Sequence, residues 1–153
     1  MGRSYIWLAI AAMSALATGA QAQDKSRIPP VAVYQAMLDS ARQTGWAQFR
    51  DWNGRQLIYF SPLVTLHCRL REIRYSINSR ALDRRFELPK CNPQLPLSLP
   101  ADAGLDTIAI SLAPGEADTV AVQVVWDDGE QSEIAVYEPC QDAGDRTCAW
   151  PVE

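Results

Sequence analysis

The fold is decided by the stretch AQFRDWNGRQLIYF, residues 47–60, in which Asn53-Gly54 separates two runs rich in aromatic and aliphatic side chains. Asn-Gly is the preferred pair for a two-residue hairpin turn, because both residues of that turn need positive φ. Pairing outward from the turn gives the pairs Trp52–Arg55, Phe49–Ile58 and Ala47–Phe60. One face of the hairpin is therefore apolar, and the sequence predicts an antiparallel sheet with a buried side.

A second hairpin is predicted over residues 119–137. A two-residue turn at Asp128-Gly129 would set Val124 against Glu133 and mix polar with apolar residues on one face. A three-residue loop, residues 127–129, keeps one face apolar and places Gly129 in the left-handed conformation that a bulge requires. We therefore expect the pairs Val120–Val136, Val122–Ile134, Val124–Ser132 and Trp126–Glu130.

An amphipathic helix is predicted between Pro29-Pro30 and Gly45, since proline favours the first turn of a helix and glycine its end. Its apolar stripe consists of Val33, Met37 and Ala41, with Tyr34 and Leu38 beside it. We expect this stripe to pack on the domain that follows.

Residues 63–77 fit both helical and strand spacing. Their aromatic and β-branched residues favour a strand, with a bulge near Arg71-Glu72. Residues 86–88 and 107–112 are expected to form further short strands, joined by a proline-rich connection. The chain therefore predicts a mainly β fold, in which an N-terminal helix precedes a small disulfide-stapled antiparallel β-sandwich; a partly open β-barrel is the alternative.

The N-terminus is typical of a secretory signal peptide, because Arg3 precedes an apolar run and Ala20-Gln21-Ala22 fits the small-x-small cleavage site. We divide the chain into a cleaved signal peptide, residues 1–22, a disordered mature N-terminus, residues 23–28, and a single domain, residues 29–153. The apolar run is shorter than the roughly 20 residues that span a bilayer, so no transmembrane segment is expected. The expected compartment is a bacterial periplasm, with secretion as the alternative.

Export makes the four cysteines candidates for two disulfides, for which the sequence allows three pairings. We favour Cys68–Cys91 together with Cys140–Cys148, because the second pair closes a short polar loop that contains Gly144. A zinc site or a redox-active dithiol is less expected, since the chain has no Cys-x-x-Cys and one histidine. No metal or cofactor is predicted.

Charge is unevenly distributed along the chain. Residues 42–90 carry ten basic and four acidic side chains, whereas residues 91–153 carry one basic and twelve acidic ones. Either strands from the two halves neutralise one another across the sheet, or Arg69, Arg71 and Arg74 belong to a basic surface for an anionic partner. Nucleic acid is not an expected partner, because the chain is exported and has a net charge of −4.

No catalytic residue is predicted, and the chain is not expected to be an enzyme. His67 lacks the Gly-x-Ser-x-Gly elbow of a serine hydrolase and is expected to pack in a strand. The candidate interaction residues lie at the predicted hairpin tips, where Trp52 and Trp126 would form an exposed patch if they are close together. The acidic tip adds Asp127, Asp128 and Glu130.

The leading functional hypothesis is a non-enzymatic, exported interaction module, a cell-envelope accessory protein that binds another envelope or periplasmic protein. An inhibitor of an envelope-degrading hydrolase such as lysozyme is the first alternative, because a small, acidic, exported protein attracts basic hydrolases. A binder of a small anionic ligand at residues 69–90 is the second.

Overall fold

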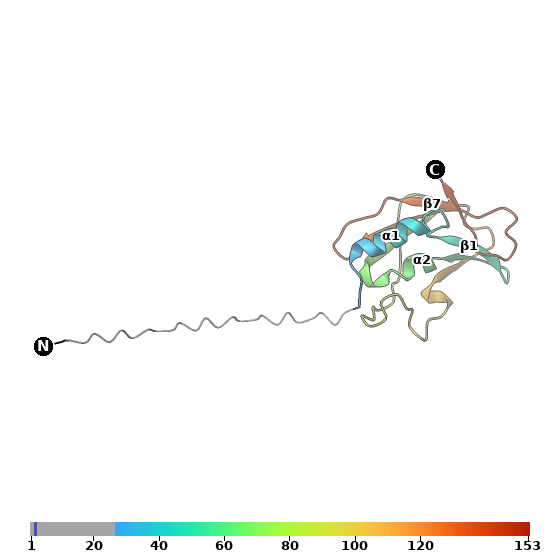
Figure 1. Cartoon of the computed structure of the whole chain (residues 1–153). Helices are drawn as coiled ribbons and strands as arrows, with labels where there is room; N and C mark the ends of the chain where they lie inside the picture. Colours follow the sequence, from blue (N-terminus) through green and yellow to red (C-terminus); the bar gives the residue numbers. More distant parts are fainter. Residues whose placement is uncertain (1, 3–26) are drawn as a thin grey trace.

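The computed structural model describes residue 2 and residues 27–153. The rest of the predicted signal peptide and residues 23–26 lie outside the described residues. The described chain forms two helices and eight strands, joined by two short 3₁₀ turns (Figure 1). In chain order they are α1 (Val31–Ala41), β1 (Gln48–Trp52), β2 (Arg55–Tyr59), α2 (Ser61–Val64), η1 (His67–Arg69), β3 (Leu70–Ile77), β4 (Arg84–Phe86), η2 (Leu105–Thr107), β5 (Ala109–Leu112), β6 (Val120–Trp126), β7 (Ala135–Glu138) and β8 (Trp150–Val152).

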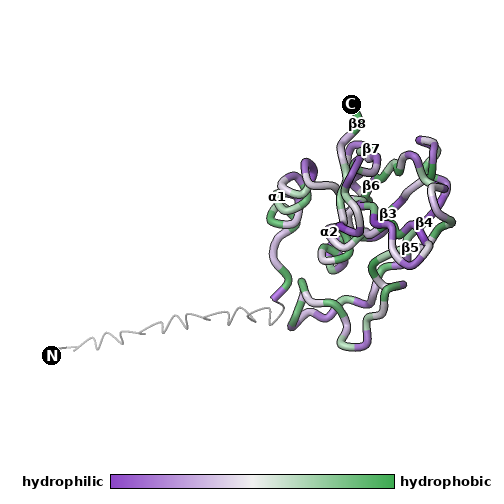
Figure 2. Tube along the Cα trace, turned by 90° about the vertical axis from the view of Figure 1, so that its right-hand side faces the viewer, coloured by the Kyte–Doolittle hydropathy of each residue, from purple (hydrophilic) through white to green (hydrophobic). Residues whose placement is uncertain are grey.

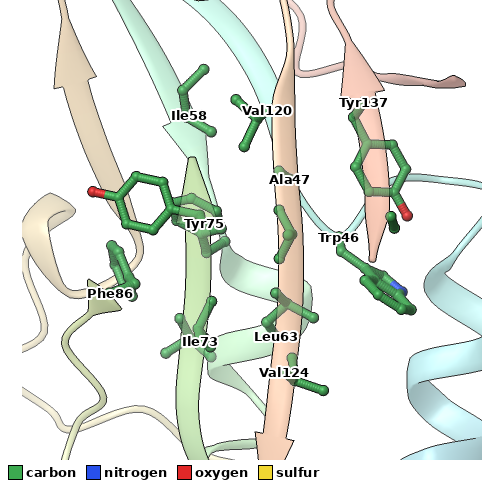
Figure 3. Packing of buried hydrophobic residues seen from close by; sticks show 14 of the residues in the cluster. Trp46, Ala47, Ile58, Leu63, Ile73, Tyr75, Phe86, Val120, Val124 and Tyr137 are labelled. Atoms are coloured by element: carbon green, nitrogen blue, oxygen red, sulfur yellow. The ribbon is translucent and has the colours of Figure 1, made fainter. Parts of the chain in front are cut away.

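The strands form two separate antiparallel sheets, one of order β1-β2-β5 and one of order β4-β3-β6-β7-β8. A single buried cluster draws side chains from both sheets and from both α-helices (Figure 3). The predicted β-sandwich is therefore confirmed, and the strands are not closed into the alternative barrel.

The first hairpin has the predicted register. Trp52 pairs with Arg55 and Phe49 with Ile58, and both turn residues have positive φ, 50° at Asn53 and 69° at Gly54. Phe49 and Ile58 are both buried, as an apolar hairpin face requires. The Asn-Gly turn therefore sets which face of this sheet is buried.

The second hairpin has the predicted tip but a different register beyond it. Gly129 has φ 95°, and the Trp126 N–H donates to the Glu130 carbonyl oxygen at 2.8 Å, as the three-residue loop requires. Farther out, the expected pairs of Val120 with Val136 and of Val122 with Ile134 are wrong. Val120 instead pairs with Tyr137, and Val122 with Ala135.

The shift originates at Ser132. The Val124 N–H donates to the Ser132 hydroxyl at 3.0 Å, where a regular ladder would use a backbone carbonyl, and that hydroxyl donates to the Glu133 carbonyl oxygen. The ladder is interrupted there, and pairing resumes at Ala135 with the register shifted by one residue. This brings the large ring of Tyr137 into the core and leaves Ile134 exposed.

Residues 63–77 combine the two predicted patterns. The strand begins only at Leu70, and its pairing with β6 is irregular between Leu70 and Glu72, which confirms the bulge. The strand prediction is wrong for residues 63–69, which lie in α2, in a turn at residues 65–66 and in η1. Pro62 stands in the first turn of α2, where proline favours a helix. His67 consequently lies buried in a 3₁₀ turn rather than in a strand.

Helix α1 buries a different face from the predicted one. Tyr34 and Leu38 are buried, whereas Val33 and Met37 are 46% and 36% exposed. The predicted packing of the Val33 stripe is therefore wrong, and the neighbouring stripe faces the core. Two short strands also differ from their predicted ranges, because β4 ends at Phe86 and β5 begins only after the 3₁₀ turn η2.

The C-terminal end of α1 is held by two aromatic side chains. The Trp46 indole N–H donates to the Leu38 carbonyl oxygen at 2.8 Å, and the Tyr137 hydroxyl donates to the Arg42 carbonyl oxygen at 2.9 Å. Figure 3 shows Trp46 and Tyr137 next to each other. Burial raises the pKa of Tyr137, so its hydroxyl keeps the proton that it donates.

Both favoured disulfides are confirmed. Cys68–Cys91 joins η1 to the irregular connection between β4 and β5, and Cys140–Cys148 closes the loop between β7 and β8. The irregular connection lies at the end of the sandwich remote from the C-terminus (Figures 1 and 2). No helix within residues 27–153 is long and apolar enough to cross a membrane.

Removal of the buried Gln56 amide is expected to destabilise the fold. Gln56 is 4% exposed; its Nε2 donates to the Ala117 carbonyl oxygen at 3.0 Å, and its Oε1 accepts from the Ala117 N–H at 2.7 Å. Gln56→Ala leaves both backbone groups of Ala117 unpaired, so the free energy of unfolding should fall by about 2 kcal/mol in urea titrations. The control Gln48→Ala removes an amide that bonds one exposed carbonyl and should change stability by less than about 1 kcal/mol. Equal stability of the two variants would contradict this role of Gln56.

Candidate functional site

The predicted acidic tip lies against two of the predicted arginines. Arg69 Nη1 is 3.1 Å from Asp127 Oδ2, and the Asp127 N–H donates to the Arg69 carbonyl oxygen at 2.8 Å. Arg71 Nη2 donates to the Asp127 carbonyl oxygen at 2.9 Å. Here the basic and acidic halves of the sequence meet across β3 and β6, as the first interpretation of the charge pattern expects.

Arg74 is engaged within the basic half itself. Arg74 and Arg85 are direct partners in the register of β3 and β4, an arrangement in which like charges repel. Glu72 lies between them, with Oε2 2.7 Å from Arg74 Nε and 3.0 Å from Arg85 Nε. The hydrogen bond from Arg74, aided by the charges of both arginines, holds the pKa of Glu72 below its ordinary value. The three predicted arginines therefore all have partners within the protein.

The two predicted tryptophans differ in exposure. Trp52 is 51% exposed at the tip of the first hairpin, where the Arg50 guanidinium lies 4.3 Å from its ring centroid. Trp126 is only 3% exposed, because the hairpin turns its ring into the core cluster. The condition for a shared exposed patch of Trp52 and Trp126 is therefore not met.

A cleft of about 420 Å³ lies between α1 and the turn that links β6 to β7; we call it the α1 cleft. Three buried side chains, Leu38, Trp46 and Trp126, form its floor. Polar side chains form its rim: Gln35, Asp39, Arg42, Glu130, Gln131, Ser132 and Glu133. Trp126 and Glu130, both predicted as interaction residues, therefore contribute to one site.

The α1 cleft already holds one cationic side chain of the protein. The Arg42 guanidinium lies 5.5 Å from the Trp46 ring centroid, and its Nη1 is 3.0 Å from Glu133 Oε2. The carboxylates of Asp39 and Glu130 form no salt bridge with another described residue. The cleft is thus lined by three carboxylates and one guanidinium above an aromatic floor, a balance of charge that attracts a further cation.

Asp39, Arg42 and Trp46 were not among the residues predicted from the sequence. A signal for them exists, because the end of a helix leaves carbonyl groups that need donors, and Trp46 follows the predicted helix directly. Asp128 lies outside the cleft lining and uses its Oδ1 to accept the Glu130 N–H at 2.9 Å, as a turn residue does.

Residues 27–153 contain no group of three or more histidine, cysteine or acidic side chains placed to hold a metal ion. No family model matches the sequence, and no curated protein or solved structure matches the chain. The function must therefore be inferred from the geometry of the α1 cleft.

The salt bridges of Glu72 are expected to make stability depend on pH. Because its pKa is lowered in the folded protein, ionised Glu72 stabilises the fold above the ordinary carboxyl pKa of 4.5, and this contribution disappears as the pH falls through the folded-state pKa. Glu72→Gln should therefore lower the melting temperature at pH 7, and its difference from the wild type should shrink below pH 4.5. Thermal unfolding by circular dichroism between pH 2.5 and 7 measures both effects.

Glu87→Gln is the matched control for Glu72→Gln, since Glu87 is exposed and forms no salt bridge with a described residue. Its melting temperature should follow that of the wild type across the same pH range. A constant difference between Glu72→Gln and the wild type at every pH would contradict the electrostatic role of Glu72.

Proposed function

We propose that the protein is a non-enzymatic, exported binding protein that holds a basic partner protein in the α1 cleft. The observation that carries this proposal is the Arg42 guanidinium, which lies on Trp46 and Glu133 in a cleft with two carboxylates that form no salt bridge within residues 27–153. A lysine or arginine of the partner would bind Asp39 and Glu130 in the same way that Arg42 binds Glu133.

Charge complementarity supports a cationic partner. The rim carries three carboxylates and one guanidinium, so its net charge favours an incoming cation. The buried indoles of the floor keep water away from one side of the site, which strengthens both ion pairs and cation–π contacts. The partner would therefore associate more slowly and more weakly as salt concentration rises.

An exposed apolar side chain beside the rim supports a protein rather than a small molecule. Ile134 follows the rim residue Glu133 and is exposed, whereas the exposed Val33 and Met37 lie on another face of α1 that shares no residue with the cleft lining. Protein interfaces commonly combine apolar anchors of this kind with a charged rim. The two disulfides are compatible with export, and a periplasmic location, with secretion as the alternative, is part of the proposal.

Inhibition of a basic envelope-degrading hydrolase such as lysozyme is the second candidate function. The same acidic rim favours it, because the inhibitor would present that rim to a basic enzyme. The third hypothesis, an anionic ligand at residues 69–90, is less favoured, because Arg69, Arg71 and Arg74 already bind acidic or carbonyl groups of the protein.

Site-specific cross-linking tests the docking of a basic protein. With a photoreactive residue in place of Gln131, on the rim, the mature protein should cross-link to a basic protein of an envelope extract. The double reversal Asp39→Lys with Glu130→Lys should weaken this binding at least about tenfold, since it replaces two attractive charges by repulsive ones. The affinity of the same two proteins should be measured at low and at physiological salt, and it should be lower at physiological salt.

The matched control is Asp102→Lys with Asp106→Lys, which reverses two exposed acids of another surface. This control should retain binding. Equal cross-linking of the two double variants, or a captured partner that is acidic, would overturn the proposal. A basic lysozyme serves as the probe for the second candidate. If the wild type blocks cell-wall lysis by this enzyme and the double variant Asp39→Lys with Glu130→Lys does not, the protein is an inhibitor.

A further inference from the structure

The single histidine of the chain lies beside one of the two disulfides. His67 is 4% exposed, and its Nδ1 is 2.9 Å from the Val64 carbonyl oxygen. A carbonyl oxygen can only accept, so Nδ1 must carry the hydrogen of the neutral ring. The lone pair is then on Nε2, which lies 3.7 Å from the Cys68 sulfur.

The two sulfurs of this disulfide have different surroundings. Cys68 follows the buried His67, whereas Cys91 lies in the irregular connection between the exposed residues Lys90 and Asn92. Both cysteines are half-buried, so neither is closed to solvent. Cys91 thus lies among exposed residues of the connection, and Cys68 is the sulfur that lies next to the imidazole Nε2, which can carry a proton to it.

We propose that Cys68–Cys91 is an exchangeable disulfide, in which Cys91 is the sulfur attacked by a dithiol and His67 assists the departure of Cys68. The thiolate of the dithiol forms a bond to Cys91 Sγ while the Cys91–Cys68 bond breaks, and the electron pair of that bond leaves with Cys68 Sγ. The proton that the attacking thiol gives up to solvent is passed to this thiolate through His67 Nε2, and the ring returns to its neutral form with the hydrogen on Nδ1. The second thiol of the dithiol then attacks the mixed disulfide and releases Cys91, so the dithiol is oxidised and the protein gains two electrons and two protons.

The reduced protein would keep a reactive thiol at Cys68. The Cys68 S–H faces the Nε2 lone pair, and transfer of the proton gives a thiolate beside an imidazolium. Such a pair lowers the pKa of a cysteine thiol below its ordinary value of about 8.5. Cys140–Cys148 has no histidine beside it, because the single histidine of the chain lies at Cys68. This second disulfide therefore provides a comparison within the same molecule.

Exchange at this site would release the irregular connection from the 3₁₀ turn η1. The bridge links positions 23 residues apart, and Leu88 and Leu99 of the same connection pack only partly against the core. This site is separate from the α1 cleft, since neither cysteine lines it, and it does not depend on the function proposed for that cleft.

Alkylation kinetics test the inference on the whole mature protein. The protein is reduced without denaturant and treated with iodoacetamide between pH 5.5 and 9, and each cysteine is followed by mass spectrometry. Cys68 should react with a midpoint at lower pH than the other three cysteines. At pH 6.5 it should react about threefold faster than Cys91, because a larger thiolate fraction outweighs the lower nucleophilicity of a more acidic thiol.

His67→Asn is the matched variant, because its amide can still donate to the Val64 carbonyl oxygen but offers no basic nitrogen to Cys68. It should return the Cys68 rate to that of Cys91 and leave the rates of Cys140 and Cys148 unchanged. A second measurement uses the oxidised wild type with reduced glutathione and an acid quench. The mixed disulfide should form on Cys91, with Cys68 as the free thiol.

Two outcomes would overturn the inference without reference to the variant. One is a Cys68 alkylation profile that coincides with that of Cys91 in the wild-type protein. The other is a glutathione adduct found mainly on Cys68. Either result would leave Cys68–Cys91 as a structural bridge like Cys140–Cys148.

Discussion

The C-terminal carbonyls of α1 are the groups on which the arrangement of the domain depends. A helix of eleven residues has little stability alone, and its last carbonyl oxygens have no partner within the helix. Here Trp46 and Tyr137 supply buried donors to two carbonyls of this end, those of Leu38 and Arg42. One donor lies two residues before β1 and the other belongs to β7, so a single helix end ties both sheets together. The same contacts fix the backbone from which Arg42 reaches the α1 cleft.

Most of the fold could be predicted because its determinants are local in sequence. The Asn53-Gly54 turn sets one register, and the predicted export together with the cysteine spacing indicates the two disulfides. The register error in the second hairpin has a different origin. At Ser132 a side-chain hydroxyl takes the place of a backbone acceptor, and no pattern of apolar residues reports such a substitution. The choice between two adjacent apolar stripes of α1 was likewise decided by packing at Tyr34 and Leu38.

The candidate site was less predictable than the fold. Turn chemistry located Glu130 and Asp127. Hydrophobicity does not show whether a tryptophan next to a turn is exposed or buried: Trp52 is exposed and Trp126 is buried. The cleft itself arises from residues of α1 and of the β6–β7 turn that are about ninety positions apart, such as Arg42 and Glu133. Their proximity depends on the Tyr137 hydrogen bond, which exists only once both sheets are in place.

The interruption at Ser132 also separates the rim of the α1 cleft from the core. In an uninterrupted hairpin, an inserted or deleted residue would turn the whole of β7 over and expose Tyr137. Here Glu130, Gln131 and Ser132 pair in one register and Ala135 in another, with Glu133 and Ile134 between them, so a change of length in this turn can be absorbed within it. The length and the charge of this rim can therefore change while the packing beneath Trp46 and Tyr137 stays the same.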